Sequence, residues 1–283
     1  MMKELAEILI EGVRYSFDPE TEYMKDGHAY CKTCHERKDG EVKSLMDMKF
    51  IFKNNCKCDR ERFEKQKQRE KDQEIERLKR SCFISMSQWA YTFDNYKGET
   101  DKSYTIAKNY VKEYEQMKKE NIGLLFCGTV GSGKTYLACC IANALIEEYM
   151  IRVKIRNFAQ IINDLQKSGF DLDKNDYIES LTNVSVLILD DLGIERDTSY
   201  AKEQVYNIVN SRYLKQKPTI FTTNLPYEKI QNSDDGVEYE RIYSRIIEMC
   251  IPIKVMGEDF RKRLQKEKLK QNKERLLKGG ERT

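Results

Sequence analysis

Little net charge and no long apolar run characterise this chain of 283 residues. Fifty lysines and arginines face 47 acidic residues, and a net charge of +3 is too small to indicate a nucleic-acid partner, so any basic surface must come from local clustering. No apolar stretch approaches the roughly 18 residues that a membrane helix requires. Glu4 and Glu7 interrupt the apolar start and no small-residue cleavage site follows, so we expect a cytoplasmic protein without a signal peptide or membrane contact.

The cysteines of this chain are the next informative feature, because several of them lie close together in the sequence. Disulfides are rare in the cytosol, so clusters among the nine cysteines indicate a metal site. Two close pairs lie near the start of the chain: Cys31, Cys34, Cys56 and Cys58. Four thiolates would form a closed, structural Zn²⁺ site, and a short polar region could hardly bury a core without one. The second pair is C-x-C and not C-x-x-C, His28 or His35 could replace one thiolate, and free thiols remain an alternative.

The stretch GTVGSGKT, from Gly128 to Thr135, matches the phosphate-loop pattern G-x-x-x-x-G-K-T. Its glycines let backbone N–H groups surround phosphate oxygens, and the following helix presents its positive end to the same anion. Lys134 would reach the β- and γ-phosphates of ATP, and the Thr135 hydroxyl would coordinate Mg²⁺. A glycine turn before an ordinary helix is the alternative, but the apolar strand ahead of the loop favours the motif. The residues expected to contact the nucleotide are Gly128, Thr129, Val130, Gly131, Ser132, Gly133, Lys134, Thr135 and Tyr136.

Five β-rich apolar runs alternate with segments long enough for helices. The runs cover residues 122–128, 151–157, 184–193, 218–224 and 250–256. This alternation predicts an α/β fold in which a five-stranded parallel sheet is covered by helices on both faces.

Polar residues stand at the ends of two of these runs, where a site that hydrolyses a nucleotide would require them. Asp190 could hold Mg²⁺, and Asp191 could orient or deprotonate the attacking water. Asn224, at the end of the next run, could contact the γ-phosphate or the water. Taken alone, the acids could cap a helix and Asn224 could be a turn residue. Arg245 and Arg261 could stabilise charge on the γ-phosphate, although residue type alone does not distinguish them from surface arginines.

The ordered set of motifs resembles AAA+ ATPases of the DnaC/DnaI helicase-loader type and their relatives, the IstB transposition helper ATPases. It consists of GTVGSGKT as Walker A, VLILDDLG as Walker B, IFTTN as sensor I, ERIYSR before the last run and EDFRKR after it. YTFDNY ahead of the core resembles a signature segment of these loaders. The paired cysteines before a charged helix resemble loaders from phage and mobile elements of Gram-positive bacteria. The chain departs from many AAA+ proteins at Asp191, where they carry Glu, and too few residues follow the last run for a full lid domain.

The resemblance also implies roles for individual residues. Arg245 resembles an arginine finger that acts on ATP held by a neighbouring subunit, and Arg261 resembles a sensor II arginine that acts in cis. Thr198 and Tyr200 match an insert by which loaders touch single-stranded DNA. Tyr200 could stack on a base, with Arg196 or Lys202 near the DNA backbone, or it could be an exposed aromatic at a helix start.

We therefore expect an N-terminal zinc-binding and helicase-interaction module (1–58), a charged helical linker (59–82), an AAA+ ATPase core (83–265) and a charged C-terminal tail (266–283). The expected function is ATP-dependent loading of a hexameric replicative helicase onto single-stranded DNA. ATP would drive self-association, and hydrolysis would release the partner. An apolar face of a first helix, formed by Leu5, Ile8 and Leu9, would add a helicase contact.

Two other functions are compatible with the motifs. One is an IstB-like transposition helper that binds duplex DNA. The other is a zinc-bearing DNA-binding adaptor that uses ATP only as a structural ligand.

Overall fold

The computed structural model describes residues 5–46, 48–96, 102–167, 171–193, 198–233, 236–257 and 259–278, without the side chains at 167, 171–173, 261, 263–264, 271 and 274–278. The chain divides into two compact units, residues 1–73 and 74–283, and the boundary falls inside one helix, α1 (Lys57–Cys82). Each unit is described by itself below. No helix in the described residues is both long and apolar enough to span a membrane.

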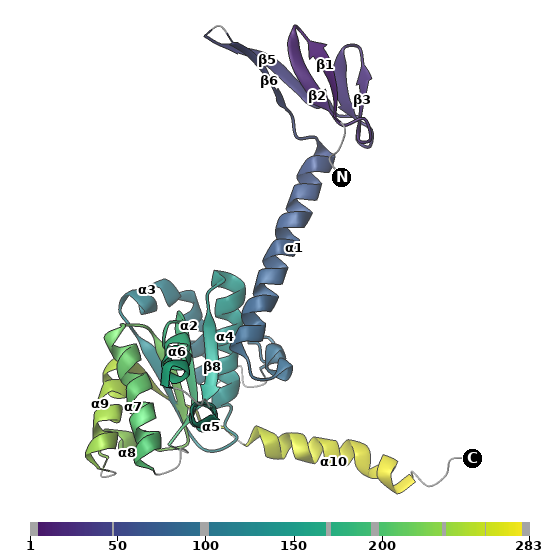
Figure 1. Ribbon diagram of the computed structural model, residues 1–283. Coiled ribbons are helices and arrows are strands. Elements are labelled where there is room, and N and C mark those ends of the chain that lie inside the picture. The colour runs from purple at the N-terminus through teal and green to yellow at the C-terminus, as the bar shows by residue number, and fades with distance from the viewer. Residues whose placement is uncertain are drawn as a thin grey trace. The chain divides into compact units, whose positions relative to one another are not determined.

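The first unit is built from antiparallel hairpins (Figure 1). Its strands are β1 (Ala6–Ile10), β2 (Val13–Phe17), β3 (Glu22–Lys25), β4 (His28–Cys31), β5 (Asp39–Leu45) and β6 (Met48–Lys53). They pair as β1–β2, β3–β4 and β5–β6. The buried apolar cluster identified in this unit is small, with Ile10, Tyr15 and Ala29 at its centre.

The expected first helix with Leu5, Ile8 and Leu9 on one face is wrong, because residues 6–10 form strand β1. Glu11 and Gly12 connect β1 to β2 with φ values of 49° and 81°. A two-residue turn with both φ values positive matches the twist of a hairpin, and glycine adopts that conformation at little cost. The turn therefore overrides the helix-like spacing of the apolar residues.

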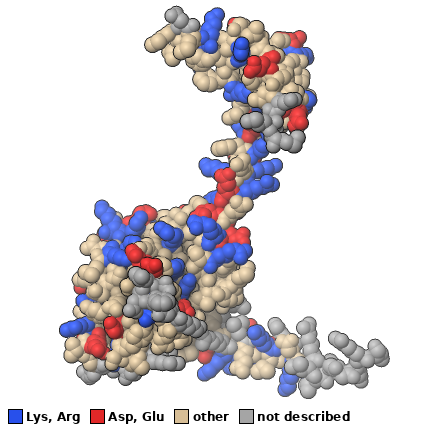
Figure 2. All heavy atoms as spheres, viewed as in Figure 1, with Lys and Arg blue, Asp and Glu red and all other residues tan. Residues whose placement is uncertain are grey.

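Helix α1 contains the charged stretch that precedes the core. Figure 2 shows lysine and arginine interspersed with acidic residues along it, and Arg77–Glu74 and Arg80–Glu76 form ion pairs at helical spacing. Its last turn packs into the second unit through Leu78 and Cys82, whose side chains are 2 % and 0 % exposed.

The second unit has a five-stranded parallel sheet in the order β11-β7-β10-β9-β8, which confirms the predicted fold class. Its strands are β7 (Gly123–Cys127), β8 (Val153–Asn157), β9 (Val186–Leu192), β10 (Thr219–Thr223) and β11 (Cys250–Lys254). The helical elements are η1 (Met86–Ala90), α2 (Lys102–Lys112), α3 (Tyr114–Lys119), α4 (Lys134–Tyr149), α5 (Phe158–Lys167), α6 (Asp171–Thr182), α7 (Ser199–Leu214), α8 (Tyr227–Gln231), α9 (Val237–Met249) and α10 (Phe260–Lys278).

Alternating side chains of the strands divide the core into two layers. Leu124 and Phe126 of β7 pack with the end of α1, α2 and α4 on one face of the sheet. Leu125 and Cys127 pack with α5, α7 and α9 on the other face. Both faces are therefore buried, as expected for strands that are apolar throughout (Figure 1).

Three details differ from the patterns of the sequence. The helical spacing of Ile106, Tyr110 and Val111 predicts one buried face, but Ile106 is 37 % exposed. The helical stretch ends at Lys112 and restarts at Tyr114, so α2 and α3 are separate helices. Helix α10 runs to Lys278 and includes most of the stretch assigned to a charged tail.

Candidate nucleotide-binding site

The phosphate loop joins β7 to α4. Gly131 and Gly133 have φ values of 80° and 99°, which other residues adopt only with strain. These two glycines turn the loop so that α4 begins at Lys134. The Oγ atom of Ser132 is buried and has no hydrogen-bond partner among the described residues. A backbone cradle and an unpartnered buried hydroxyl at the start of a helix fit a phosphate group.

Lys134 points back across the loop. Its Nζ atom donates to the carbonyls of Gly128 (2.9 Å) and Thr129 (2.7 Å), and to Oδ1 of Asn224 (2.8 Å). Strand β10 lies between β7 and β9, so Asn224 follows the strand between the phosphate loop and the acids. The structure thus brings Lys134 and Asn224 together across 90 residues of sequence.

The acidic end of the site forms where β9 ends. The hydroxyls of Thr135 and Thr222 donate to Oδ1 of Asp190 at 2.9 and 2.6 Å. Burial raises the pKa of the Asp190 carboxyl, and the hydrogen bond from Thr222 offsets part of that rise. Thr135 and Asp190, both expected to hold Mg²⁺, are therefore in direct contact, and a cation of this type prefers such oxygen ligands.

Asp191 adopts a φ of 59°, which is uncommon for a residue with a side chain. Its backbone N–H donates to Oγ1 of Thr222 (3.0 Å), and Nδ2 of Asn157 donates to its Oδ2 (3.3 Å). The carboxylate lines the same pocket as Lys134 and Asn224, so it lies within the site that the sequence assigned to it.

That pocket has a volume of about 720 Å³ and two chemically different ends. The phosphate loop, Asp191 and Asn224 line one end. Ile84, Ser85, Gln88 and Tyr91, from η1 and its flanks, line the other with Tyr136, and Phe260 lies next to the phosphate loop. The rings of Tyr91 and Tyr136 stack with centroids 4.5 Å apart. An anion-binding end that continues into an aromatic and polar end suits a nucleotide.

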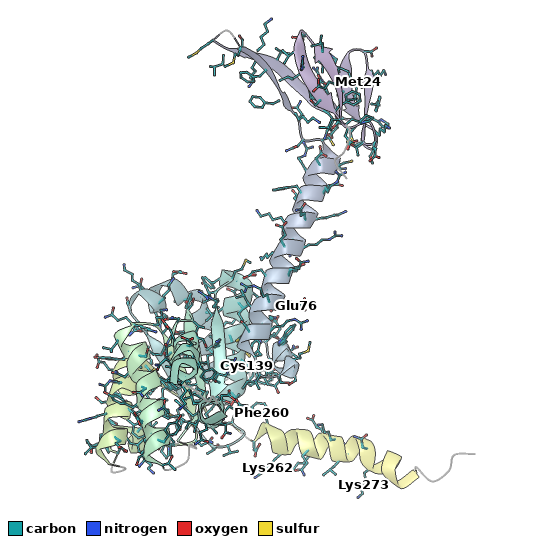
Figure 3. All side chains as sticks on the ribbon, in the orientation of Figure 1. Met24, Glu76, Cys139, Phe260, Lys262 and Lys273 are labelled. Carbon is teal, nitrogen blue, oxygen red and sulfur yellow. The ribbon has the colours of Figure 1, made fainter. Side chains whose placement is uncertain are left out.

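The start of α10 closes against the phosphate loop. The backbone N–H of Phe260 donates to the carbonyl of Gly131 (3.1 Å), and its ring lies 6.0 Å from that of Tyr96, centroid to centroid. Phe260 is labelled in Figure 3 where α10 begins. Arg261 follows it on α10, but its side chain lies outside the described residues, so its predicted role stays a prediction.

Arg245 does not line this pocket. On α9 its guanidinium donates to Oδ1 of Asn210 (3.0 Å) and to the hydroxyl of Tyr206 (3.2 Å), and it lies over the rings of Tyr206 and Tyr213. Contacts with α7 thus hold a half-buried arginine away from the phosphate loop of its own chain. Its predicted action on a neighbouring subunit remains a prediction.

The two residues expected at DNA lie at the start of α7. Thr198 is the N-cap residue, and its Oγ1 accepts from the backbone N–H of Ala201 (3.2 Å). Tyr200 is half-buried. Arg196 lies outside the described residues, and Lys202 lies over the ring of Tyr239.

In the first unit, the four paired cysteines converge. The Sγ atoms of Cys31, Cys34, Cys56 and Cys58 all lie within 4.8 Å of one another. A hydrogen bond from the backbone at Glu36 lowers the pKa of the Cys34 thiol to about 6, which favours its thiolate form. This donor set fits a tetrahedral Zn²⁺ ion, whose ligand sulfurs lie roughly 3.8 Å apart.

Both histidines considered as ligands have other partners. Nδ1 of His28 lies 2.8 Å from Oδ2 of Asp39, and Nδ1 of His35 lies 3.2 Å from the hydroxyl of Tyr23. The candidate metal cluster contains the four cysteines and neither histidine.

Some residues of the site were missed from the sequence. Thr222 lies two positions before Asn224 on the same strand, so strand alternation could have indicated it. Asn157 ends the predicted run 151–157 and Tyr91 begins the segment YTFDNY, so both had a signal that was not used. Ser85 and Gln88 had none, because only the folded chain brings them to the nucleotide pocket.

The strand order, the loop between β7 and α4, and the acids at the end of β9 are those of a P-loop ATPase of the AAA+ type. More specifically, the chain belongs to the IstB-like ATP binding protein family, whose sequence profile matches residues 58–268. The resemblance drawn from the motifs is thereby confirmed.

Individual relatives agree with this assignment. The phage-like element PBSX protein XkdC of Bacillus subtilis is 33 % identical over 52 % of this chain and 55 % of its own length. The replicative helicase loader DnaI of the same organism is 28 % identical over 54 % of this chain and 51 % of its own length. The chain thus spans about half the length of these relatives. A crystal structure of the DnaC helicase loader has 28 % identity and a TM-score of 0.52, and covers 61 % of this chain and all (100 %) of that one.

Proposed function

We propose that this protein is an ATP-dependent loader that places a hexameric replicative helicase on single-stranded DNA. The observation that carries the proposal is the convergence of Lys134, Thr135, Asp191 and Asn224 on one pocket, with Asp190 bonded to Thr135 beside it. The core that holds this pocket is similar to that of proteins named helicase loaders.

ATP would occupy the pocket with its phosphates at the loop and its base toward η1. Lys134 would exchange its contacts with loop carbonyls for phosphate oxygens while staying next to Asn224. Thr135 and Asp190 would hold Mg²⁺, which would supply positive charge at the phosphates. Asp191 would orient or deprotonate the attacking water, helped by the hydrogen bond from Asn157.

Hydrolysis would act as a switch between subunits. With ATP bound, Arg245 would reach the γ-phosphate in a neighbouring copy, and its contacts with Tyr206 and Asn210 would keep it extended along α7 until then. Arg261 would contact the nucleotide in cis. Loss of the γ-phosphate would weaken the interface and release the partner.

The remaining parts would contact the partners. The four cysteines would hold a structural Zn²⁺ ion in the module of residues 1–58, which would bind the helicase, and the charged helix (59–82) would link it to the core (83–265). Thr198 and Tyr200, at the start of α7, would lie along single-stranded DNA, and the tail (266–283) would stay outside the core.

The test is a reconstitution with the purified chain, the replicative helicase of its source organism and circular single-stranded DNA. We expect ATP to increase the amount of helicase retained on the circle, and Lys134→Ala to abolish that increase. Lys119→Ala, which changes an exposed lysine at the end of α3 that does not line the nucleotide pocket, is the control. The proposal is wrong if the wild-type chain binds ATP yet leaves helicase retention unchanged.

The family match also favours a second candidate, an IstB-like helper that binds duplex DNA and delivers it to a transposase. A preference for duplex over single-stranded DNA at matched salt would support this candidate. Absence of steady-state ATP turnover would instead support an adaptor that uses ATP as a structural ligand.

A further inference from the structure

Asn143 is a buried amide in the middle of α4, the helix that begins at the phosphate loop. Its side chain is 1 % exposed. Asparagine is a poor helix residue, and a buried amide is costly unless its groups are paired. Oδ1 of Asn143 has no hydrogen-bond partner among the described residues, so this position carries that cost. The NH₂ group of the side chain must therefore explain why an asparagine occupies this position.

The Nδ2 atom of Asn143 donates to three backbone carbonyls. Two belong to another segment, those of Gln88 (3.0 Å) and Tyr91 (3.0 Å), and the third is that of Cys139 in the preceding turn (3.1 Å). Because all three partners are acceptors, the NH₂ group and not the oxygen must face them. Asn143 thus ties the segment from Gln88 to Tyr91 onto α4.

The segment from Gln88 to Tyr91 depends on contacts with α4 for its conformation. Helix η1 has only five residues, and a 3₁₀ turn of this length has little stability of its own. Inside it, Gln88 Oε1 accepts from the backbone N–H groups of Ile84 and Ser85, which shapes the turn without attaching it to the core. Contacts between the segment and α4 are the hydrogen bonds from Asn143, a long hydrogen bond from Nε2 of Gln88 to Sγ of Cys139 (3.7 Å) and the stacking of Tyr91 on Tyr136. The bonds from Asn143 are the shorter ones and reach both ends of the segment.

The tied segment forms the end of the nucleotide pocket that lies away from the phosphates. Gln88, Tyr91 and Tyr136 line that end, while Lys134 and Thr135 line the other. Lys134 and Thr135 bond to Asn224 and Asp190, whereas the hydrogen bonds of Asn143 go to Gln88, Tyr91 and Cys139. The two ends can therefore be perturbed separately.

We propose that Asn143 is a positioning residue that holds η1 and Tyr91 as the wall against which the purine base of the nucleotide binds. The inference rests on nucleotide binding in this pocket, which is part of the proposed function. It adds that base recognition depends on an amide that touches neither the base nor the phosphates.

The test compares Mg–ATP with Mg–tripolyphosphate, which has the phosphates but no base. For Asn143→Leu, similar in size but without donors, we expect ATP affinity to fall on the order of tenfold, because the two hydrogen bonds to the carbonyls of Gln88 and Tyr91 that order the base wall are lost. Tripolyphosphate affinity stays within about twofold of wild type, and the preference for ATP over GTP shrinks. Asn109→Leu, an exposed helical asparagine, is the matched control.

Two outcomes overturn the inference. Either ATP and tripolyphosphate affinities fall together, as for a general loss of stability, or ATP affinity does not change. A wild-type chain that binds no ATP would instead refute the proposed function itself.

A measurement on the wild type covers the case in which Asn143→Leu does not fold. In hydrogen exchange, ATP should slow the amides of residues 85–91 and tripolyphosphate should not. Equal protection by both ligands would overturn the inference.

Discussion

Arg212 shows how a single charged residue can be built into a core. Its side chain is 0 % exposed, and burial lowers the pKa of the guanidinium to about 10, so it is still a cation at neutral pH. The guanidinium donates to Thr219 Oγ1 and to the carbonyls of Thr182, Val184, Ser185 and Pro218. These carbonyls precede β9 and β10, so one side chain satisfies the backbone where two central strands begin.

We predict that Arg212→Met lowers the free energy of unfolding by about 3 kcal/mol or more, because several buried carbonyls lose their donor. Arg152→Met, at an exposed position, should change it by about 0.5 kcal/mol or less. Urea denaturation followed by circular dichroism measures both. Equal effects of the two substitutions would show that the buried hydrogen bonds contribute nothing.

Asp191 combines an unusual backbone with a chemical role. Its positive φ is tolerated by asparagine as well as by aspartate, so Asp191→Asn removes the charge without straining the turn. We predict that this substitution keeps ATP affinity and lowers turnover by about 10²- to 10⁴-fold, the range attributed to a general base. Calorimetry and phosphate release measure the two quantities. Unchanged turnover would show that Asp191 is not the catalytic base.

At the scale of elements, the last turn of α1 depends on a contact from the sheet. Arg156 of β8 donates from Nη1 to the carbonyl of Cys82 (2.9 Å) and from Nη2 to that of Ser81 (3.4 Å). A helix leaves its last carbonyls unpaired, and a cation is favourable at that end. Arg156 therefore fixes the end of α1 on the second unit, next to the buried side chains of Leu78 and Cys82.

We predict that Arg156→Ala speeds hydrogen exchange in residues 78–82 severalfold and leaves exchange in α4 unchanged. Lys154→Ala is the matched control, because Lys154 lies two residues earlier on β8 and contacts Ser180 of α6. Faster exchange throughout the second unit would mean that Arg156 supports the whole fold and not the end of α1.

Elements also show where sequence patterns succeed and fail. The five strands of the sheet could be predicted because they are buried on both faces and therefore apolar throughout. Strand β1 could not, since Leu5, Ile8 and Leu9 have a helix-like spacing and the two-residue turn at Glu11 and Gly12 decides the structure. Local turn geometry overrides weak periodicity in a hairpin with few buried contacts.

At the scale of the whole molecule, two units rely on different sources of stability. The second has large apolar layers on both faces of its sheet. The described part of the first has a small buried cluster around Ile10, Tyr15 and Ala29, together with four converging cysteines. A small core is rarely sufficient for stability, so the proposed Zn²⁺ ion would contribute directly to the folding of this unit.

We predict that a zinc-selective chelator abolishes the β-structure of the first unit, while ATP affinity with Mg²⁺ restored stays within about twofold. Metal analysis, circular dichroism and calorimetry on the full chain measure bound zinc, β-structure and ATP affinity in that order. Cys34→Ser should imitate the chelator, and Cys140→Ser, a buried cysteine of α4 outside the cluster, should retain zinc. A full complement of zinc in Cys34→Ser would contradict the four-cysteine site.

The sequence by itself determined the residues whose chemistry depends on spacing along the chain: the phosphate loop, the acids that end a buried strand, and the paired cysteines. It determined the parallel sheet as well, because burial on both faces imposes apolar strands. Only the tertiary structure decided which distant groups meet, such as Asn224 with Lys134, Thr222 with Asp190, and Asn143 with the segment that ends at Tyr91. These contacts form between segments far apart in the chain, and no motif records which polar side chain of one segment will meet which side chain or backbone carbonyl of another.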